Sequence, residues 1–218
     1  GSLKGVGNNE DGEISSTLEK TVIKDFTDFC IKDGSGRQLA AISAVCCTYG
    51  TLYMFSKSSG NERQLVLCDS SINGGDPVFL DIGNHHPVSL FGGYYHSAAI
   101  GSEGEVIFIN RNSVKNSPNS PIAAVSLPDG EKASSVACCE DSVVVLSSNG
   151  RVFTSPIEEG SSVLNFSIVS ELSGQEIVCV SGTYNHFLAV SKEGRVFGRG
   201  SNEYGKLCLG EETDSDSS

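Results

Sequence analysis

The fold is decided by residues 177–210, which read IVCVSGTYNHFLAVSKEGRVFGRGSNEYGKLCLG. Two apolar runs flank a turn at Gly194, and this pattern predicts a β-hairpin. The second half of the stretch, GRGSNEYGK, resembles a phosphate-binding loop. However, that loop needs Ser or Thr after its lysine to hold magnesium, and here Leu207 follows Lys206. Glu203 would also place a negative charge inside the phosphate cradle, so we interpret the stretch as a structural repeat and not as a nucleotide site.

The same unit recurs along the chain. An apolar run, a turn ending in glycine and a second apolar run occur around Gly50, Gly104, Gly150 and Gly194, at spacings of 54, 46 and 44 residues. A partial unit at residues 3–14 contains GVGNNEDGEI, which matches GRGSNEYGKL of the fourth unit. Further short strands are expected upstream of the hairpins, at Pro87–Leu90, Ser134–Ala137 and Ile177–Val180.

Three to four strands in each unit indicate an all-β protein built of β-propeller blades. One small sheet cannot bury both of its faces, so neighbouring blades must stack on it. We therefore expect propeller repeats over residues 1–210 and an acidic polar tail or loop over residues 211–218.

The composition narrows the classes of function. The chain has 218 residues, 25 of them glycine, and a net charge of −12, which disfavours direct binding to nucleic acid. Its eight cysteines form no C-x-x-C pair, and its four histidines do not stand at metal-ligand spacing with them, so we expect no metal and no cofactor. Most of the cysteines lie in apolar runs, which suits the reducing interior of a cell. No apolar run approaches the length of a membrane span.

A second pattern precedes the turns. Gly92 and Gly182 stand twelve residues before their turn glycines, and His96 and His186 stand eight residues before them. Gly-x-x-x-His, an apolar strand, a glycine turn, Val-Phe and GRGSNEYGKLCLG together resemble the repeat of the regulator of chromosome condensation (RCC1) family. The resemblance is strongest over residues 92–108 and 177–210, and Phe197 stands where many members have Trp.

This resemblance implies a seven-bladed propeller, of which the chain supplies about four repeats. We therefore expect an incomplete propeller, completed by a complementary propeller segment or a second chain. Alternatively, the repeats close with fewer blades, as in an oligomer.

The resemblance also indicates candidate partner-binding residues. The turn before the inner strand lines one rim near the central channel in this family. The candidates there are Tyr94, Tyr95, His96, Tyr184, Asn185 and His186. For the histidines we favour the alternative that their rings satisfy backbone groups between blades, and for the tyrosines packing is an equal alternative. Arg111 and Lys115 form a basic spot in residues 110–130, which are either a recognition loop or a variable surface loop.

No nucleophile motif, paired-carboxylate pattern or metal spacing indicates catalysis. Our first hypothesis is a protein–protein interaction scaffold in signalling, and we expect an intracellular protein in the cytoplasm more than in the nucleus. The resemblance implies a second hypothesis, a guanine-nucleotide exchange factor for Ran or another small GTPase, which would act without acid–base chemistry. The chain lacks a recognisable copy of the wedge and of the basic tail that Ran and chromatin roles would need.

Overall fold

The computed structural model describes residues 3–8, 22–29, 42–57, 63–69, 72, 77–117, 122, 124–158, 161 and 163–207. The expected tail at residues 211–218 lies outside this part of the chain. No helix among the described residues is long and apolar enough to cross a membrane.

The described residues form five antiparallel sheets, in chain order. The first pairs β1 (Leu3–Asn8) with β2 (Val22–Phe29). Blade 1 contains β3 (Ile42–Thr48), β4 (Thr51–Lys57), β5 (Arg63–Cys68) and β6 (Val78–Phe79). Blade 2 contains β7 (Pro87–Gly92), β8 (Ser97–Gly101), β9 (Val106–Ile109) and β10 (Ala124–Val125). Blade 3 contains β11 (Ala133–Cys138), β12 (Ser142–Ser147), β13 (Val152–Pro156) and β14 (Ser167–Ile168). Blade 4 contains β15 (Ile177–Thr183), β16 (His186–Ser191) and β17 (Val196–Gly200).

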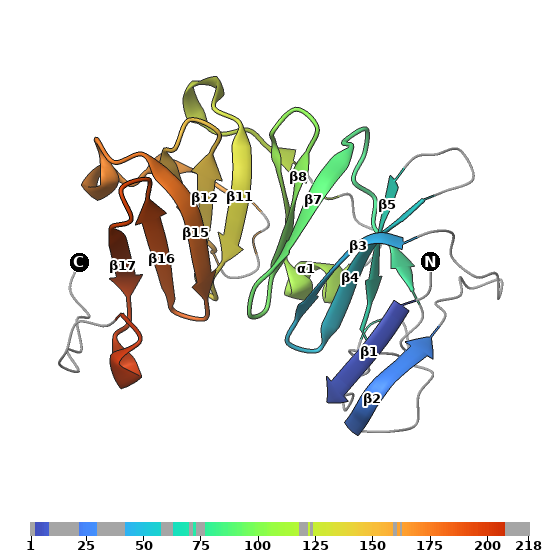
Figure 1. Ribbon diagram of the computed structural model, residues 1–218. Coiled ribbons are helices and arrows are strands. Elements are labelled where there is room, and N and C mark those ends of the chain that lie inside the picture. The colour runs from blue at the N-terminus through green and yellow to red at the C-terminus, as the bar shows by residue number, and fades with distance from the viewer. Residues whose placement is uncertain are drawn as a thin grey trace.

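The sheets stand side by side in an open arc, with the first and last sheets at opposite ends (Figure 1). The structure thus confirms an all-β, incomplete propeller. A helix, α1 (Arg111–Asn116), and three short 3-10 turns (Pro128–Gly130, Ser170–Leu172 and Glu203–Gly205) complete the described elements.

The hydrophobic core lies between neighbouring blades, because the inner strands are apolar on both faces. All five residues of β8 and all four of β9 are buried. One buried cluster joins blades 1 and 2, a second joins blades 2 and 3, and a third joins blades 3 and 4. Backbone hydrogen bonds reinforce these contacts. The Ala133 N–H donates to the Gly104 carbonyl of the preceding blade at 2.9 Å, and the Ile177 N–H donates to Gly150 at 3.0 Å.

The first unit is phased differently from the sequence prediction. Gly104, Gly150 and Gly194 lie between the second and third strands of their blades, whereas Gly50 lies between β3 and β4, the first and second strands of blade 1. A bulge near the start of the first strand of each blade marks the repeat period more reliably than the turn glycine. These bulges begin at Ile42, Pro87, Ala133 and Ile177, at spacings of 45, 46 and 44 residues. Gly50 was misassigned because glycine suits either tight turn of a blade.

Residues 110–130 were expected to form a loop, and this prediction is wrong in part. Asn110 caps α1 through its side-chain oxygen, which accepts from the Asn112 and Ser113 N–H groups. Further on, β10 pairs with β9 and provides the outer strand of blade 2. The cysteines are also less uniform than expected, because Cys68, Cys138 and Cys139 are buried but Cys47 and Cys179 are exposed.

Candidate partner-binding rim

The turns between the first and second strands of all four blades lie at one end of the arc, the lower end in Figure 1. These turns are linked across blades by backbone hydrogen bonds. The Tyr49 N–H donates to the Tyr94 carbonyl at 2.7 Å, and the Glu140 N–H donates to the Tyr184 carbonyl at 2.6 Å. Gly93 permits a close approach of blade 2 to blade 3, because a Cβ atom there would lie 2.0 Å from the Cys138 carbonyl oxygen. The rim is therefore tied together by its main chain.

Four tyrosines from three blades meet on this rim, and we call them the tyrosine cluster: Tyr49, Tyr94, Tyr95 and Tyr184. The Tyr94 ring centroid lies 4.4 Å from that of Tyr95, 5.1 Å from Tyr184 and 5.8 Å from Tyr49. Most of these pairs are T-shaped, a favoured aromatic geometry. Tyr49 and Tyr184 are 58% and 42% exposed, and the other two are half-buried. The cluster is thus an ordered aromatic surface that water reaches.

Tyr95 stays uncharged at neutral pH. A hydrogen bond with the Tyr94 side chain raises the pKa of Tyr95 above its ordinary value, and the negative charges of Glu140 and neighbouring groups act in the same direction. Because the ordinary tyrosine pKa is already about 10, the Tyr95 hydroxyl remains protonated.

The two predicted histidines are more buried than Tyr49 and Tyr184. His96 is 5% exposed, and its ring centroid lies 5.5 Å from that of Phe108. Burial lowers the pKa of His96, although a hydrogen bond with the Glu140 backbone opposes the shift. Burial, and then the positive charge of Lys206, lower the pKa of the half-buried His186. Both rings are therefore neutral at pH 7. The alternative favoured for them, that the rings satisfy backbone groups between blades, stays a prediction, because the buried Nδ1 atom of each ring has no hydrogen-bond partner among the described residues.

Asn185 lies in the same turn as Tyr184 but is occupied by contacts within its own blade. Its side-chain oxygen accepts from Lys206 Nζ at 2.8 Å, and its carbonyl accepts from the Ser201 N–H at 3.0 Å. Lys206 also lies 3.8 Å from a Glu203 carboxylate oxygen.

Arg111 and Lys115, predicted as one basic spot, have different environments. Arg111 lies 2.8 Å from Asp69 through Nη2, and its Nε donates to Thr51 Oγ1 at 2.9 Å. The Thr51 hydroxyl in turn donates to Asp69 Oδ2 at 2.6 Å. The Asp69 side chain is completely buried, so Arg111 joins α1 to blade 1. Lys115 is exposed in the last turn of α1. Neither lies in the tyrosine cluster.

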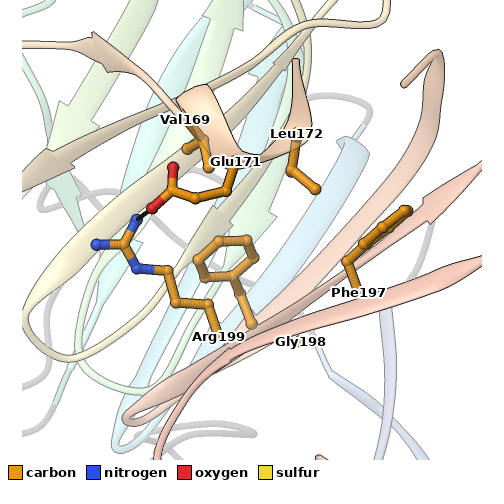
Figure 2. Close-up of a pocket in the computed structure, with 7 residues that line it drawn as sticks. Val169, Glu171, Leu172, Phe197, Gly198 and Arg199 are labelled. Carbon is orange, nitrogen blue, oxygen red and sulfur yellow. Dashed lines mark ion pairs between the residues drawn. The ribbon is translucent and has the colours of Figure 1, made fainter. Parts of the chain in front are cut away.

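A separate pocket of about 300 Å³ lies between the outer edges of blades 3 and 4 (Figure 2). Its wall is apolar apart from Glu171 and Arg199, which form an exposed ion pair at 3.7 Å. Phe197 of the pocket wall occupies the position that Phe153 holds in blade 3, and Phe153 is buried in one cluster with Leu164. The residue of blade 4 that corresponds to Leu164 lies beyond residue 207, outside the described part of the chain. We therefore assign no site to this pocket. No group of metal-ligating side chains occurs among the described residues.

Comparison with known proteins agrees with the propeller fold. Residues 177–206 match the model of the regulator of chromosome condensation (RCC1) repeat. Human WBSCR16 superimposes with a TM-score of 0.68 and 16% identity, over 96% of this chain. The chain has the RCC1-like propeller fold. Yeast RCC1 (Prp20), crystallised with Kap60, and Prp20p from Saccharomyces cerevisiae, whose binding to Gsp1p and histones was studied, each have a TM-score of 0.68 and 12% identity, over 98% and 97% of this chain.

This RCC1-like chain spans a little over half of those structures, 59% of WBSCR16 and 55–56% of the yeast proteins. No curated protein sequence matches it.

The structure brings Tyr94, Tyr95 and Tyr184 together, as their shared place in the repeat implied. It adds Tyr49 and Glu140, which the sequence reasoning missed. The first strands of blades 1 and 2 begin 45 residues apart, and Tyr49 lies 45 residues before Tyr94. Tyr49 therefore lies in the turn of blade 1 that corresponds to the Tyr94 turn of blade 2.

Proposed function

We propose that this RCC1-like chain is a protein–protein interaction module that binds its partner through the tyrosine cluster. The observation that carries the proposal is the meeting of four tyrosine rings from three blades on one rim, with two of them about half exposed. Tyrosine is enriched among the residues that dominate binding energy at protein interfaces. The hydrogen bonds between the turns hold the rings in place before binding, which lowers the entropy lost on association.

The test compares the proteins that the chain captures with and without the exposed rings. Tyr49→Ala combined with Tyr184→Ala removes the two most exposed rings of the cluster. Tyr204→Ala is the matched control, because Tyr204 is 91% exposed and lies outside the cluster. Partners that wild type and the control capture, and that the double variant loses by at least tenfold, support the proposal. Equal capture by all three proteins would refute it.

The second candidate function is guanine-nucleotide exchange on a small GTPase. It is supported by the shared fold with Prp20p, a protein whose binding to Gsp1p was studied. The experiment measures the release of fluorescent GDP from a panel of small GTPases, with and without a molar excess of the chain. Faster release from one GTPase, reduced by the double tyrosine variant, supports exchange. An unchanged release rate across the panel removes this candidate and leaves the interaction module in place.

We further propose that the outer face of blade 4 binds another blade of the same kind. Leu188, Val190 and Val196 occupy the positions that Val144, Leu146 and Val152 hold in blade 3. Val152 is 2% exposed because blade 4 covers it, whereas Val196 is 64% exposed. A native mass equal to the chain plus a further propeller segment, or to two copies of the chain, supports this partner. A stable monomer at micromolar concentration with no captured segment counts against it.

A further inference from the structure

The turns of the rim alternate between aromatic and acidic residues. Counting back from the turn glycines, Tyr94 in blade 2, Glu140 in blade 3 and Tyr184 in blade 4 occupy the same position of the repeat. The next position holds Tyr95 in blade 2 and Asp141 in blade 3. Blade 3 therefore places two carboxylates between the aromatic turns of its neighbours.

The side chains of blades 2 and 4 close over the turn of blade 3. Tyr94 and Tyr184 belong to blades that are not adjacent, yet their ring centroids are only 5.1 Å apart. Glu140 belongs to the same part of the rim, since its N–H donates to the Tyr184 carbonyl and its negative charge acts on Tyr95. The rings and the carboxylate thus share one surface.

The rings present the right electrostatic features for a cation. Tyr49 and Tyr95 are almost perpendicular, at 84° with centroids 6.1 Å apart, and Tyr49 is mostly exposed. The face of an aromatic ring is negative and attracts ammonium or guanidinium groups within about 6 Å. Among the described residues, Lys206 bonds to Asn185, the neighbour of Tyr184 in its turn, and is also paired with Glu203.

We propose that the tyrosine cluster and Glu140 together bind an arginine or lysine side chain carried by a basic segment of the partner protein. This inference rests on the proposed interaction function and names the chemistry of the partner. The net charge of −12 favours the approach of such a segment over long range and opposes nucleic acid. Tyrosine hydroxyls at the cluster edge and the Glu140 carboxylate would accept hydrogen bonds from the cation.

The experiment measures fluorescence anisotropy with two labelled peptides, a (Gly-Arg)6 repeat and the same peptide with citrulline in place of arginine. Citrulline keeps the shape and most donors of arginine but is neutral. We expect the arginine peptide to bind the wild-type chain at least about tenfold more tightly, with affinity falling as salt rises. Equal binding of the two peptides would overturn the proposal.

Two sets of variants locate the site on the rim. Glu140→Gln is compared with Glu158→Gln, which removes the same charge from an exposed position in the connection after β13. Tyr49→Leu, which keeps apolar area but loses the ring, is compared with Tyr49→Phe and with Tyr204→Leu. We expect Glu140→Gln and Tyr49→Leu to weaken arginine-peptide binding by about three- to tenfold, and the other three to stay within about twofold. Losses no larger than those of the controls would overturn the proposal.

The outcome is separable from that of the proposed function. If partner capture depends on the tyrosines but the arginine peptide shows no preference over citrulline, the rim is an interaction surface that does not select cations. If partner capture is also unchanged by the tyrosine substitutions, the interaction function itself has failed.

Discussion

Replacing Arg111, the first residue of α1, with methionine should destabilise the chain strongly. The Asp69 side chain is completely buried and receives hydrogen bonds from Arg111 Nε and from the Thr51 hydroxyl, at 2.9 and 2.6 Å. Removing one partner of a buried ion pair leaves an uncompensated charge, at a cost of about 3–5 kcal/mol. The Arg111 side chain is 17% exposed, so water can partly solvate Asp69 in the variant. We therefore expect a loss near the lower end, about 3 kcal/mol.

The assay is urea-induced unfolding followed by circular dichroism, and it includes two further variants. Lys115→Ala changes the other cation of α1, which is exposed, and should alter the free energy of unfolding by no more than about 0.5 kcal/mol. Asp69→Asn combined with Arg111→Met removes both charges, so it should be more stable than Arg111→Met alone by about 1 kcal/mol or more. The double variant isolates the buried charge from the lost packing of the arginine stem.

The reasoning is refuted if Arg111→Met costs no more than Lys115→Ala. It is also refuted if the double variant is as unstable as Arg111→Met, because the loss would then come from packing and not from the buried carboxylate.

Three further predictions test the packing between blades, and each is measured by urea unfolding. Burial lowers the pKa of His96, so the wild-type chain loses stability as pH falls below about 6.5, where the unfolded chain takes up the proton and the folded chain does not. His96→Phe should therefore make the free energy of unfolding depend less on pH. If the free energy of unfolding falls equally for both proteins between pH 7 and 5.5, this prediction is wrong. Gly93→Ala should cost about 3 kcal/mol, since the new Cβ would lie 2.0 Å from the Cys138 carbonyl oxygen, and a loss under about 1 kcal/mol would show that the turn relaxes. Val152 is 2% exposed, so Val152→Arg should abolish the cooperative unfolding transition. Val196 is 64% exposed, so Val196→Arg should change the free energy of unfolding by about 0.5 kcal/mol or less. Similar losses for both variants would mean that the outer face of blade 4 is also covered in solution.

Much of the fold could be predicted from the sequence, because a hairpin leaves local signals. The strands expected at Pro87–Leu90, Ser134–Ala137 and Ile177–Val180 lie within β7, β11 and β15. The phase of blade 1 could not be predicted from its turn glycine, since both tight turns of a blade accept one. The bulges that reveal the true period depend on hydrogen-bond register, which the sequence does not display.

The candidate site was less predictable, because it depends on contacts between blades. Tyr94 and Tyr184 were found through a repeat pattern, but Tyr49 required the corrected phase of blade 1. The role of Arg111 depends on Asp69, 42 residues earlier in the chain, and no local pattern connects the two. Arg111 and Lys115 were interpreted as one basic spot in a recognition loop or a variable surface loop, whereas the buried partner of Arg111 makes it a structural residue.

The repeats keep contacts more faithfully than they keep residues. One side-chain pair recurs in three blades, between the residue after the turn glycine and the residue twenty positions earlier: Glu105 with His85, Arg151 with Glu131, and Arg195 with Gln175, at 3.0, 3.0 and 3.4 Å. In blade 2 the acid and the base have exchanged positions, so the contact survives although both residues differ. On the rim, in contrast, the backbone contacts are kept while the side chains change. Its turns are fixed in space by backbone bonds between blades, while one repeat position changes from tyrosine to glutamate to tyrosine. A fixed backbone with variable side chains lets the rim of this chain present its own surface, and that surface is aromatic and acidic.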